Sequence, residues 1–281
     1  GRLDPAPAPL FRNAVAEACL MPQEVHATFF RESLAGLEAP SAPFGMLDVQ
    51  LQAHDLTTAS RALDSELGAA LRHAARQLHV PVSVLFHAAF ALVVSRCSGR
   101  DDVVFGTVLS GRLQGADGRG EALGLHINTL PFRVQLDEGD ARAFVHRCHQ
   151  QLLGLLAHEQ APLPLAQRIS GLPSSMPLLT SLLNFRHSRT GAGAGLDWPG
   201  MQVLETSGDE ANFPLTAKVD DFGMEFGLCI DCHRDLDPQR LLGYLEPALT
   251  AICRATANSC AVKSLDVMPP SERRMLLGED R

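Results

Sequence analysis

The 281-residue chain is 46% hydrophobic and 20% charged, an ordinary composition for a globular protein that buries a sizeable core. Its formal net charge of −8 argues against a nucleic-acid-binding surface, which requires a basic stripe. No apolar run approaches the roughly 18 residues of a membrane-spanning helix, so we expect neither nucleic acid nor membrane as a partner. The seven cysteines are odd in number and irregular in spacing, which favours free thiols and a cytoplasmic location over a disulfide framework.

Helical and extended patterns alternate along the chain. Residues 1–20 open with a Pro/Ala-rich stretch and are predicted to be a linker. Apolar residues three and four apart predict helices over 22–37, 65–78, 83–96, 140–156 and 237–255. Ser65 is the predicted N-cap of the second helix. Runs rich in Val, Ile, Thr and Phe predict strands at 103–109, 126–134, 178–185, 213–219, 224–230 and 264–267.

The order of these segments predicts the fold class. Strands and helices interleave, which is typical of a layered α/β fold. The strand segments are almost continuously apolar, so they should be buried on both faces, with helices covering the sheet. Residues 39–45 and 189–200 are rich in turn-forming residues and are expected to be loops.

Four segments, in the same order along the chain, resemble motifs of the condensation domain of nonribosomal peptide synthetases. SGRDDVVFGTVLSGR (98–112) and LGLHINTLPFR (123–133) resemble the second half of that domain. AHEQAPLPLAQR (157–168) is similar to the family's HQxxPFxxL segment, and SMPLLTSLLNFRHS (175–188) to its SRxPLFxxxFxxxN segment. The resemblance extends from about Leu10 to Met275. It implies a mixed sheet with covering helices, similar to chloramphenicol acetyltransferase.

The resemblance also implies a reaction. In this family, the amine of an acceptor aminoacyl thioester attacks a donor thioester, and both are held on phosphopantetheine arms of peptidyl carrier proteins. The family's active-site motif is HHxxxDG, whose second His positions the amine or takes its proton. That motif does not occur in residues 1–281. Because the family has it upstream, in the N-terminal lobe, the resemblance implies that residues 21–268 are the C-terminal lobe and are inactive alone.

Other expectations follow from the same resemblance. No cofactor should be bound directly, and the partners should be donor and acceptor carrier proteins, the N-terminal lobe and an adenylation domain. Residues 269–281 resemble the linker to that adenylation domain. Segments near 196–205 and 213–227 match the family's bridges between lobes. The segments APSAPFGMLDV (39–49) and HEQAPLPLAQRISG (158–171) are similar in sequence to members of the dual epimerisation/condensation subclass.

Candidate substrate-binding residues lie in the segment that matches the family's GxFxNTxxxR pattern. Gly124, Asn128, Thr129 and Arg133 match it directly, on a strand that borders the tunnel between the family's two lobes. Asn128 and Arg133 have two interpretations: substrate contact, or satisfaction of buried backbone and carboxylate groups by their several donors. His126 stands where the family usually has an apolar residue. It is either a polar group of the tunnel or a histidine satisfied by its surroundings.

A second candidate is the HxxxD pattern formed by His233 and Asp237. The shortened motif of the wider acyltransferase superfamily has this spacing, with the His as base and the Asp orienting it. Alternatively, Asp237 is the N-cap and Pro238 the first residue of the last helix, both favoured positions. The two interpretations lead to different proteins: a free acyltransferase that uses His233, or a histidine with no catalytic role.

The remaining motifs are weaker. Cys229 and Cys232 have CxxC spacing, but residues three apart on a strand point to opposite faces, and no second ligand pair completes a metal site. His146 and His149 share a helix face without further ligands nearby. Residues 220–223 (DDFG) resemble a turn of the acyltransferase superfamily, and GAGAG at 191–195 lacks dinucleotide-site spacing. No metal site is therefore expected.

A non-catalytic module that only docks carrier proteins is a further alternative. If a partner lobe is missing, an apolar patch larger than the few hundred Å² usual for monomers should be exposed.

Overall fold

The computed structural model describes residues 10–112, 123–187, 212–258 and 260–278. Their strands form one sheet in the order β1-β6-β5-β4-β2-β3. The pairs β2–β4 and β4–β5 are parallel and the other neighbours are antiparallel, so the sheet is mixed, as expected. The strands are β1 (Leu56–Ala62), β2 (Asp102–Leu109), β3 (Asn128–Gln135), β4 (Ser181–His187), β5 (Leu215–Asp221) and β6 (Phe226–His233).

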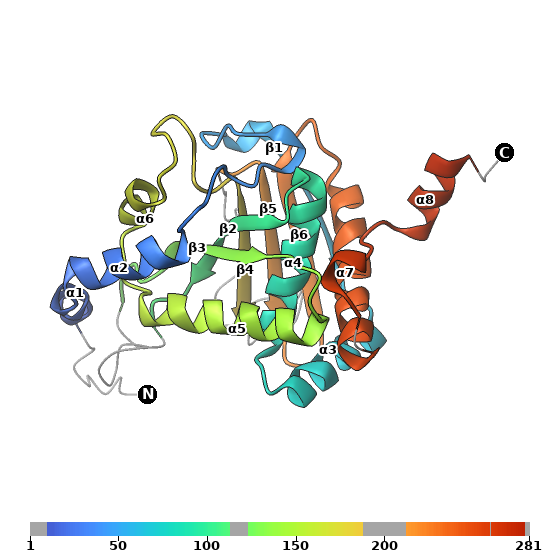
Figure 1. Ribbon diagram of the computed structural model, residues 1–281, viewed down its shortest axis with the longest axis horizontal. Helices are drawn as coiled ribbons and strands as arrows, with labels where there is room; N and C mark the ends of the chain where they lie inside the picture. The colour runs from blue at the N-terminus through green and yellow to red at the C-terminus, as the bar shows by residue number, and fades with distance from the viewer. Residues whose placement is uncertain (1–9, 113–122, 188–211, 259, 279–281) are drawn as a thin grey trace, which may run out of the picture.

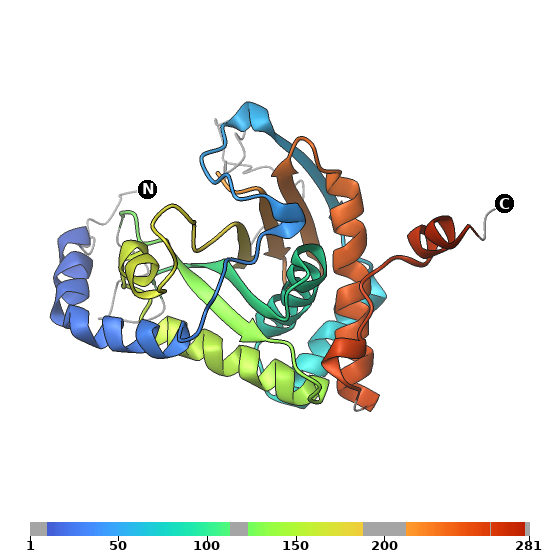
Figure 2. The ribbon, with the colours of Figure 1, turned by 45° about the horizontal axis from the view of Figure 1, so that its top comes forward.

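Helices pack against one face of this sheet, as Figures 1 and 2 show for α4, α5 and α7. Helix α4 is buried along most of its length, which explains why its sequence is apolar on nearly every side. Its Phe86 contacts Phe185 of β4 and Phe226 of β6, and its Phe90 contacts Phe105 of β2. The α-helices are α1 (Phe11–Leu20), α2 (Gln23–Ser33), α3 (Ser65–Leu78), α4 (Val82–Ser98), α5 (Ala141–Ala157), α6 (Leu163–Ile169), α7 (Pro238–Asn258) and α8 (Pro270–Leu277).

The opposite face of the sheet is polar across β1, β5 and β6. Lys218 of β5 and Asp231 of β6 are both buried, and their charged groups lie 2.6 Å apart. Thr58 of β1 donates a hydrogen bond of 2.8 Å to Asp231. Side chains alternate between the two faces of a strand, so these groups point away from the apolar face that α4 and α7 cover. The expectation of strands that are apolar on both faces therefore fails for β5 and β6.

Three details correct the sequence-based expectations. Ser65 is the first helical residue of α3, and the N-cap is Asp64, whose carboxylate accepts a hydrogen bond from the Leu67 amide over 2.9 Å. Residues 264–267 do not form a strand: residues 262–264 form a 3-10 turn, and only an isolated bridge joins Ala261 to Asp140. Because no neighbouring strand extends the pairing, the backbone of residues 262–265 bonds within its own turn instead, with the Leu265 amide donating to the Val262 carbonyl. Strand β3 begins at Asn128 rather than at residue 126.

In the described part of the chain, three α-helices and one strand were not expected from the sequence. They are α1, β1, α6 and α8. Helices α1 and α8 fall within residues 1–20 and 269–281, the two segments expected to be linkers. The loop expected at 189–200, with its GAGAG run, and the whole 196–205 bridge segment lie outside the described residues.

Within the described ranges, no single helix has the length and apolar composition of a membrane span. Helices α3 and α4 pass that test only as a pair, and they are bent by 107° at the break between them.

Candidate functional site

The segment leading into β3 lies against α1. A Cβ atom at Gly124 would collide with the ring of Phe11, so only a residue without a side chain lets α1 approach this closely. The ring of Phe11 also makes an edge-to-face contact with His126, with 5.0 Å between ring centroids. The backbone of Gly124 and the ring of His126 therefore both lie against α1. Phe11 covers both of them.

His126 is buried with an unsatisfied nitrogen. The residue is 7% exposed, and its Nε2 atom has no hydrogen-bond partner among the described residues. The backbone carbonyl of His126 lies so close to Gly111 that no Cβ fits there, and Gly111 has a φ of 65°, a conformation that favours glycine. A buried unpaired nitrogen carries a free-energy cost of about 1–3 kcal/mol. Among the four predicted substrate-binding residues, His126 is therefore the one with a buried side-chain nitrogen that lacks a hydrogen-bond partner in the described part of the chain.

Asn128 connects two of the motifs found in the sequence. Its side-chain amide donates hydrogen bonds to the carbonyls of Glu159 (2.8 Å) and Ala161 (2.7 Å), and its Oδ1 accepts one from the Thr129 amide (2.9 Å). Both amide hydrogens are used on the backbone of the loop between α5 and α6. This is the structural interpretation of Asn128, in which the side chain satisfies buried backbone groups.

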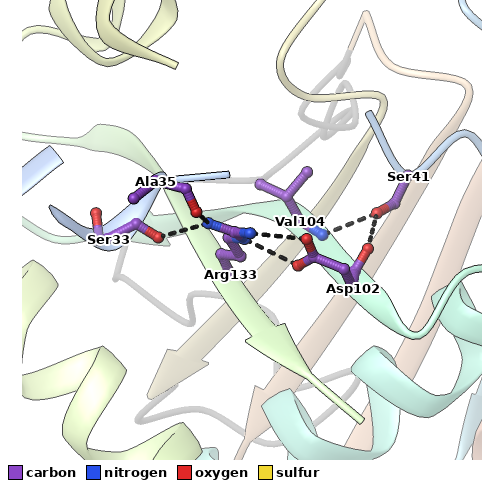
Figure 3. A network of polar contacts seen from close by, with 6 residues as sticks. All are labelled: Ser33, Ala35, Ser41, Asp102, Val104 and Arg133. Carbon is purple, nitrogen blue, oxygen red and sulfur yellow. Dashed lines mark hydrogen bonds and ion pairs between the residues drawn. The ribbon is translucent and has the colours of Figure 1, made fainter. Parts of the chain in front are cut away.

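Arg133 fixes the other end of the same strand. Its guanidinium makes a two-pronged ion pair with Asp102 (2.8 and 2.7 Å), and Nη1 donates to the carbonyls of Ser33 (3.2 Å) and Ala35 (2.7 Å), as Figure 3 shows. The side chain is only 8% exposed. Arginine suits this position because its donors form a rigid planar fork. Arg133 thus ties β2 and β3 to the end of α2.

The Ser41 side chain bonds to backbone groups of β2 beside Asp102 that no neighbouring strand reaches (Figure 3). Its hydroxyl donates to the carbonyl of Asp102 (3.3 Å) and accepts from the amide of Val104 (2.8 Å). Strand β4 pairs with β2 only from Gly106 onward, so the start of β2 would otherwise lack partners on that edge. Ser41 lies in the α2–β1 connection (residues 34–55), which is therefore anchored on β2.

His233 and Asp237 of the HxxxD pattern each bond to a different partner. The Asp237 carboxylate accepts a hydrogen bond from the Gln239 amide (2.9 Å), which makes it a cap for α7. The Nδ1 atom of His233 instead accepts one from the Asp235 amide (3.2 Å) and lies 3.5 Å from the Asp235 carboxylate. Pro238 is the first residue of α7. The geometry matches the helix-cap interpretation.

The CxxC pair is not arranged as a redox or metal site. The Sγ of Cys232 is buried 3.8 Å from the Leu236 carbonyl, whereas Cys229 points to the other face, 3.8 Å from the Asp231 carboxylate. Burial raises the pKa of Cys229 to about 11 and that of Cys232 to about 12, so both remain protonated thiols at neutral pH. Among the residues that the structure describes, no group of three or more His, Cys, Asp or Glu is placed to hold a metal ion.

The DDFG segment (220–223) forms a turn supported by a charged pair. Arg72 of α3 donates to both oxygens of Asp221 (2.6 and 3.3 Å), and the Gly223 amide donates to Asp221 over 2.9 Å. Burial alone would raise the pKa of Asp221, but the hydrogen bonds from Arg72 and Gly223 lower it overall. Gly223 has a φ of 87°, which explains the glycine at this position.

Sequence reasoning missed the charged groups on the polar face of the sheet. Lys218, Asp231 and Thr58 come from three strands, and only their register places them together. Arg186 of β4 and Asp220 of β5 form a second ion pair of 2.8 Å. The sequence signal was the break in the apolar alternation at these positions.

Comparison with known proteins identifies the family. The condensation-domain family model matches residues 22–277. Malpinin synthetase from Mortierella alpina is 40% identical over 275 residues, which cover 97% of this chain and 4% of that protein. Malpibaldin synthetase from the same organism is 37% identical over 285 residues, which cover 96% of this chain and 5% of that protein. The chain thus spans a small part of these relatives.

Solved structures show the same fold at low sequence identity. The X-domain from teicoplanin biosynthesis has a TM-score of 0.70 and 20% identity, with 88% of this chain and 57% of that chain covered. A four-domain nonribosomal peptide synthetase bound to AMP and glycine has a TM-score of 0.69 and 18% identity, with 88% of this chain and 20% of that chain covered. From residue 22 to residue 277, this chain belongs to the condensation-domain family.

Proposed function

We propose that this chain is the C-terminal lobe of a condensation domain and takes part in forming peptide bonds between carrier-bound thioesters. The amine of an acceptor aminoacyl thioester attacks the carbonyl carbon of a donor thioester. A C–N bond forms, the C–S bond breaks, and the donor thiol leaves with the proton that the amine gives up. Phosphopantetheine arms of donor and acceptor peptidyl carrier proteins hold the two thioesters.

One observation carries this proposal: the extent of the structural match. Nearly nine-tenths of this chain superposes on the teicoplanin X-domain, yet it covers only 57% of that chain. A match of that size supports a lobe rather than a whole domain. The HHxxxDG motif does not occur in residues 1–281, in line with a catalytic histidine supplied by the other lobe.

The segment 123–133 is proposed as this lobe's wall of the substrate tunnel. On the inner side of this segment Gly124 and His126 pack against Phe11 of α1, and the backbone contacts of Asn128 and the ion pair of Arg133 hold its shape. Leu123, Leu125 and Ile127 alternate with Gly124 and His126 and are 86%, 80% and 62% exposed.

This exposed apolar row is the surface that the N-terminal lobe would cover. Apolar side chains in a row are uncommon on a monomer surface and mark interaction sites.

The relatives suggest the wider setting. Malpinin synthetase and malpibaldin synthetase are each far longer than this chain. We therefore propose an adenylation domain beyond residue 281 and a cytoplasmic multimodular synthetase. The dual epimerisation/condensation subclass, suggested by residues 39–49 and 158–171, belongs to the same proposal.

The test is intact-protein mass spectrometry of an acceptor carrier protein loaded with an aminoacyl group. The acceptor is incubated with a loaded donor carrier and this chain, first alone and then with the upstream half of the same synthetase's condensation domain. We expect the acceptor to gain the donor acyl mass only when the upstream half is present. A matched control replaces the second His of HHxxxDG in that half with Ala, which should abolish the product.

The other outcomes contradict the proposal in distinct ways. Product from this chain alone would place the catalytic group within residues 1–281, with His233→Ala as the next variant. Binding of carrier proteins without product under any condition would favour the non-catalytic docking module.

A further inference from the structure

Two histidines from distant parts of the chain share a hydrogen bond. The Nδ1 atoms of His26 in α2 and His158 at the end of α5 lie 2.9 Å apart. His26 is 3% exposed and His158 is half-buried. A bond between two Nδ1 atoms requires one imidazole to donate and the other to accept, so the two rings adopt opposite tautomers.

Phe29, one turn after His26 on α2, packs against the face of the His158 imidazole. Its ring stacks on His158 with 4.2 Å between centroids and an angle of 15°. Gly154 of α5 makes this possible, because a Cβ there would lie 2.9 Å from the Phe29 ring. His26 and Phe29 thus contact His158 at its edge and at its face. These two contacts join α2 to the C-terminal end of α5.

The chemistry of the pair limits how many protons it can accept. A first proton adds to the Nε2 atom of the donor, and the resulting imidazolium still donates to its partner. A second proton has only the accepting Nδ1 lone pair left, which is the atom that closes the hydrogen bond. The bond is then lost, and two cations face each other at close range.

Burial and mutual repulsion set the pKa values of the pair. Burial lowers the pKa of His26, and burial together with the charge of His26 lowers that of His158. On α2, Glu24 pairs with Arg31 at 3.1 Å, in an exposed position. The other titratable groups on these elements are Glu32 of α2, Glu159 after α5, Arg168 of α6, and Arg142, His146, Arg147, Cys148 and His149 in the first half of α5.

We propose that the His26–His158 hydrogen bond is a pH-sensitive contact. It holds α2 on α5 at neutral pH and is lost when acidification protonates both rings. Release has a consequence at the strand ends. The carbonyl of Ser33, the last residue of α2, and that of Ala35 accept hydrogen bonds from Arg133. Freeing α2 would therefore loosen the contact between the α2–β1 connection and the Arg133–Asp102 pair (Figure 3).

Hydrogen–deuterium exchange of the whole chain tests the proposal. Exchange is measured at about pH 7.5 and about pH 5, with correction for the intrinsic rate of each amide. We expect peptides covering α2 to exchange about tenfold faster at the lower pH, while peptides covering α4 stay protected. In His158→Asn, the amide nitrogen or oxygen can replace Nδ1 but cannot be charged, so the pH-dependent change at α2 should disappear.

Three further measurements distinguish this pH-sensitive contact from a general loss of structure in acid. His146→Asn removes an exposed histidine of α5 and should leave the pH response of α2 unchanged. His26→Asn should remove that response as His158→Asn does, which gives a second route if one variant fails to fold. NMR titration of the wild type should show the two imidazoles titrating as a coupled pair.

The proposal would be overturned if α2 loses protection equally in His158→Asn. Independent titration of His26 and His158 near 6.5 would also contradict it, and so would full protection of α2 in the wild type at the lower pH.

Discussion

His87 shows how one buried titratable group sets the acid stability of this fold. It lies on α4 with both ring nitrogens bonded: Nδ1 to the Ser83 carbonyl at 2.7 Å and Nε2 to the Thr107 hydroxyl at 2.8 Å. The carbonyl can only accept, so Nδ1 carries the proton and Nε2 accepts from Thr107. Burial lowers the pKa of His87 to about 4, although the Ser83 carbonyl opposes that shift.

This lowered pKa predicts a loss of stability on acidification. In the unfolded chain His87 has a pKa of 6.5 and binds a proton as the pH falls below that value. In the folded chain it stays neutral until about pH 4. The free energy of unfolding should therefore fall by about 2 kcal/mol between about pH 7 and about pH 5 through this residue. In His87→Gln, urea unfolding should show a smaller fall by about that amount, despite lower stability at neutral pH. An unchanged pH dependence in the variant would contradict this, and His146→Asn serves as the exposed control.

At the residue scale, the number of hydrogen-bond donors on a side chain predicted its contacts better than motif matching did. The structural roles of Asn128 and Arg133 follow from how many donors each side chain must satisfy when buried. The role of Asp237 follows from its place before a proline at a helix start. By contrast, the pairing of Lys218 with Asp231 depends on the register of two strands, which no local pattern encodes.

A buried carboxylate, that of Glu272, joins helix α8 to α7. Figure 1 shows α8 extending away from α7 toward the C-terminus. Glu272 accepts hydrogen bonds from Arg240 (2.9 Å) and Tyr244 (2.8 Å), both on α7. The hydrogen bond from Arg240 lowers the pKa of Glu272, and burial with the bond to Glu272 raises the pKa of Tyr244 to about 12. Glu272 is 8% exposed, while most of its neighbours on α8 are exposed.

Glu272→Gln should release α8. The neutral amide loses the charge-assisted bond to Arg240, and such bonds are about twice as strong as neutral ones. We expect trypsin to cleave after Arg273 and Arg274 about tenfold faster, with no change in the unfolding midpoint of the body. Ser271→Ala, which alters an exposed neighbour, should cleave at the wild-type rate. Equal rates for Glu272→Gln and the wild type would show that other contacts hold α8.

At the element scale, long periodic segments were predictable and short polar ones were not. Helices α3, α4, α5 and α7 follow from apolar spacing over many turns, and their limits agree within three residues. Strand β1 reads LTTASRA, with little apolar alternation, because it is an edge strand whose pairing with β6 supplies its stability. Helix α6 spans seven residues with a proline in its first turn, too short for a helical period to stand out.

At the scale of the whole molecule, the alternation of elements was enough to predict a layered α/β fold. It was not enough to order the strands, because β1 ends at Ala62 and its neighbour β6 begins only at Phe226, far beyond the reach of any local pattern. It also did not show that the sheet has an apolar face under α4 and a polar face opposite. That difference comes from the tertiary arrangement, in which helices cover one face of β5 and β6.

The exposed apolar row at Leu123, Leu125 and Ile127 makes a prediction about association. A leucine or isoleucine side chain contributes about 1.5–3 kcal/mol when fully buried, so this row of three favours association between copies of the chain when nothing else covers it. We expect concentration-dependent self-association by analytical ultracentrifugation and binding of a hydrophobic dye. Leu123→Ser combined with Leu125→Ser should weaken the association at least about tenfold, because partial burial of two leucines is lost. Leu277→Ser, at an exposed leucine of α8, should leave it unchanged. A wild-type chain that stays monomeric and binds no dye would mean that this row is not an interface, and the case for a partner lobe at residues 123–127 would fall with it.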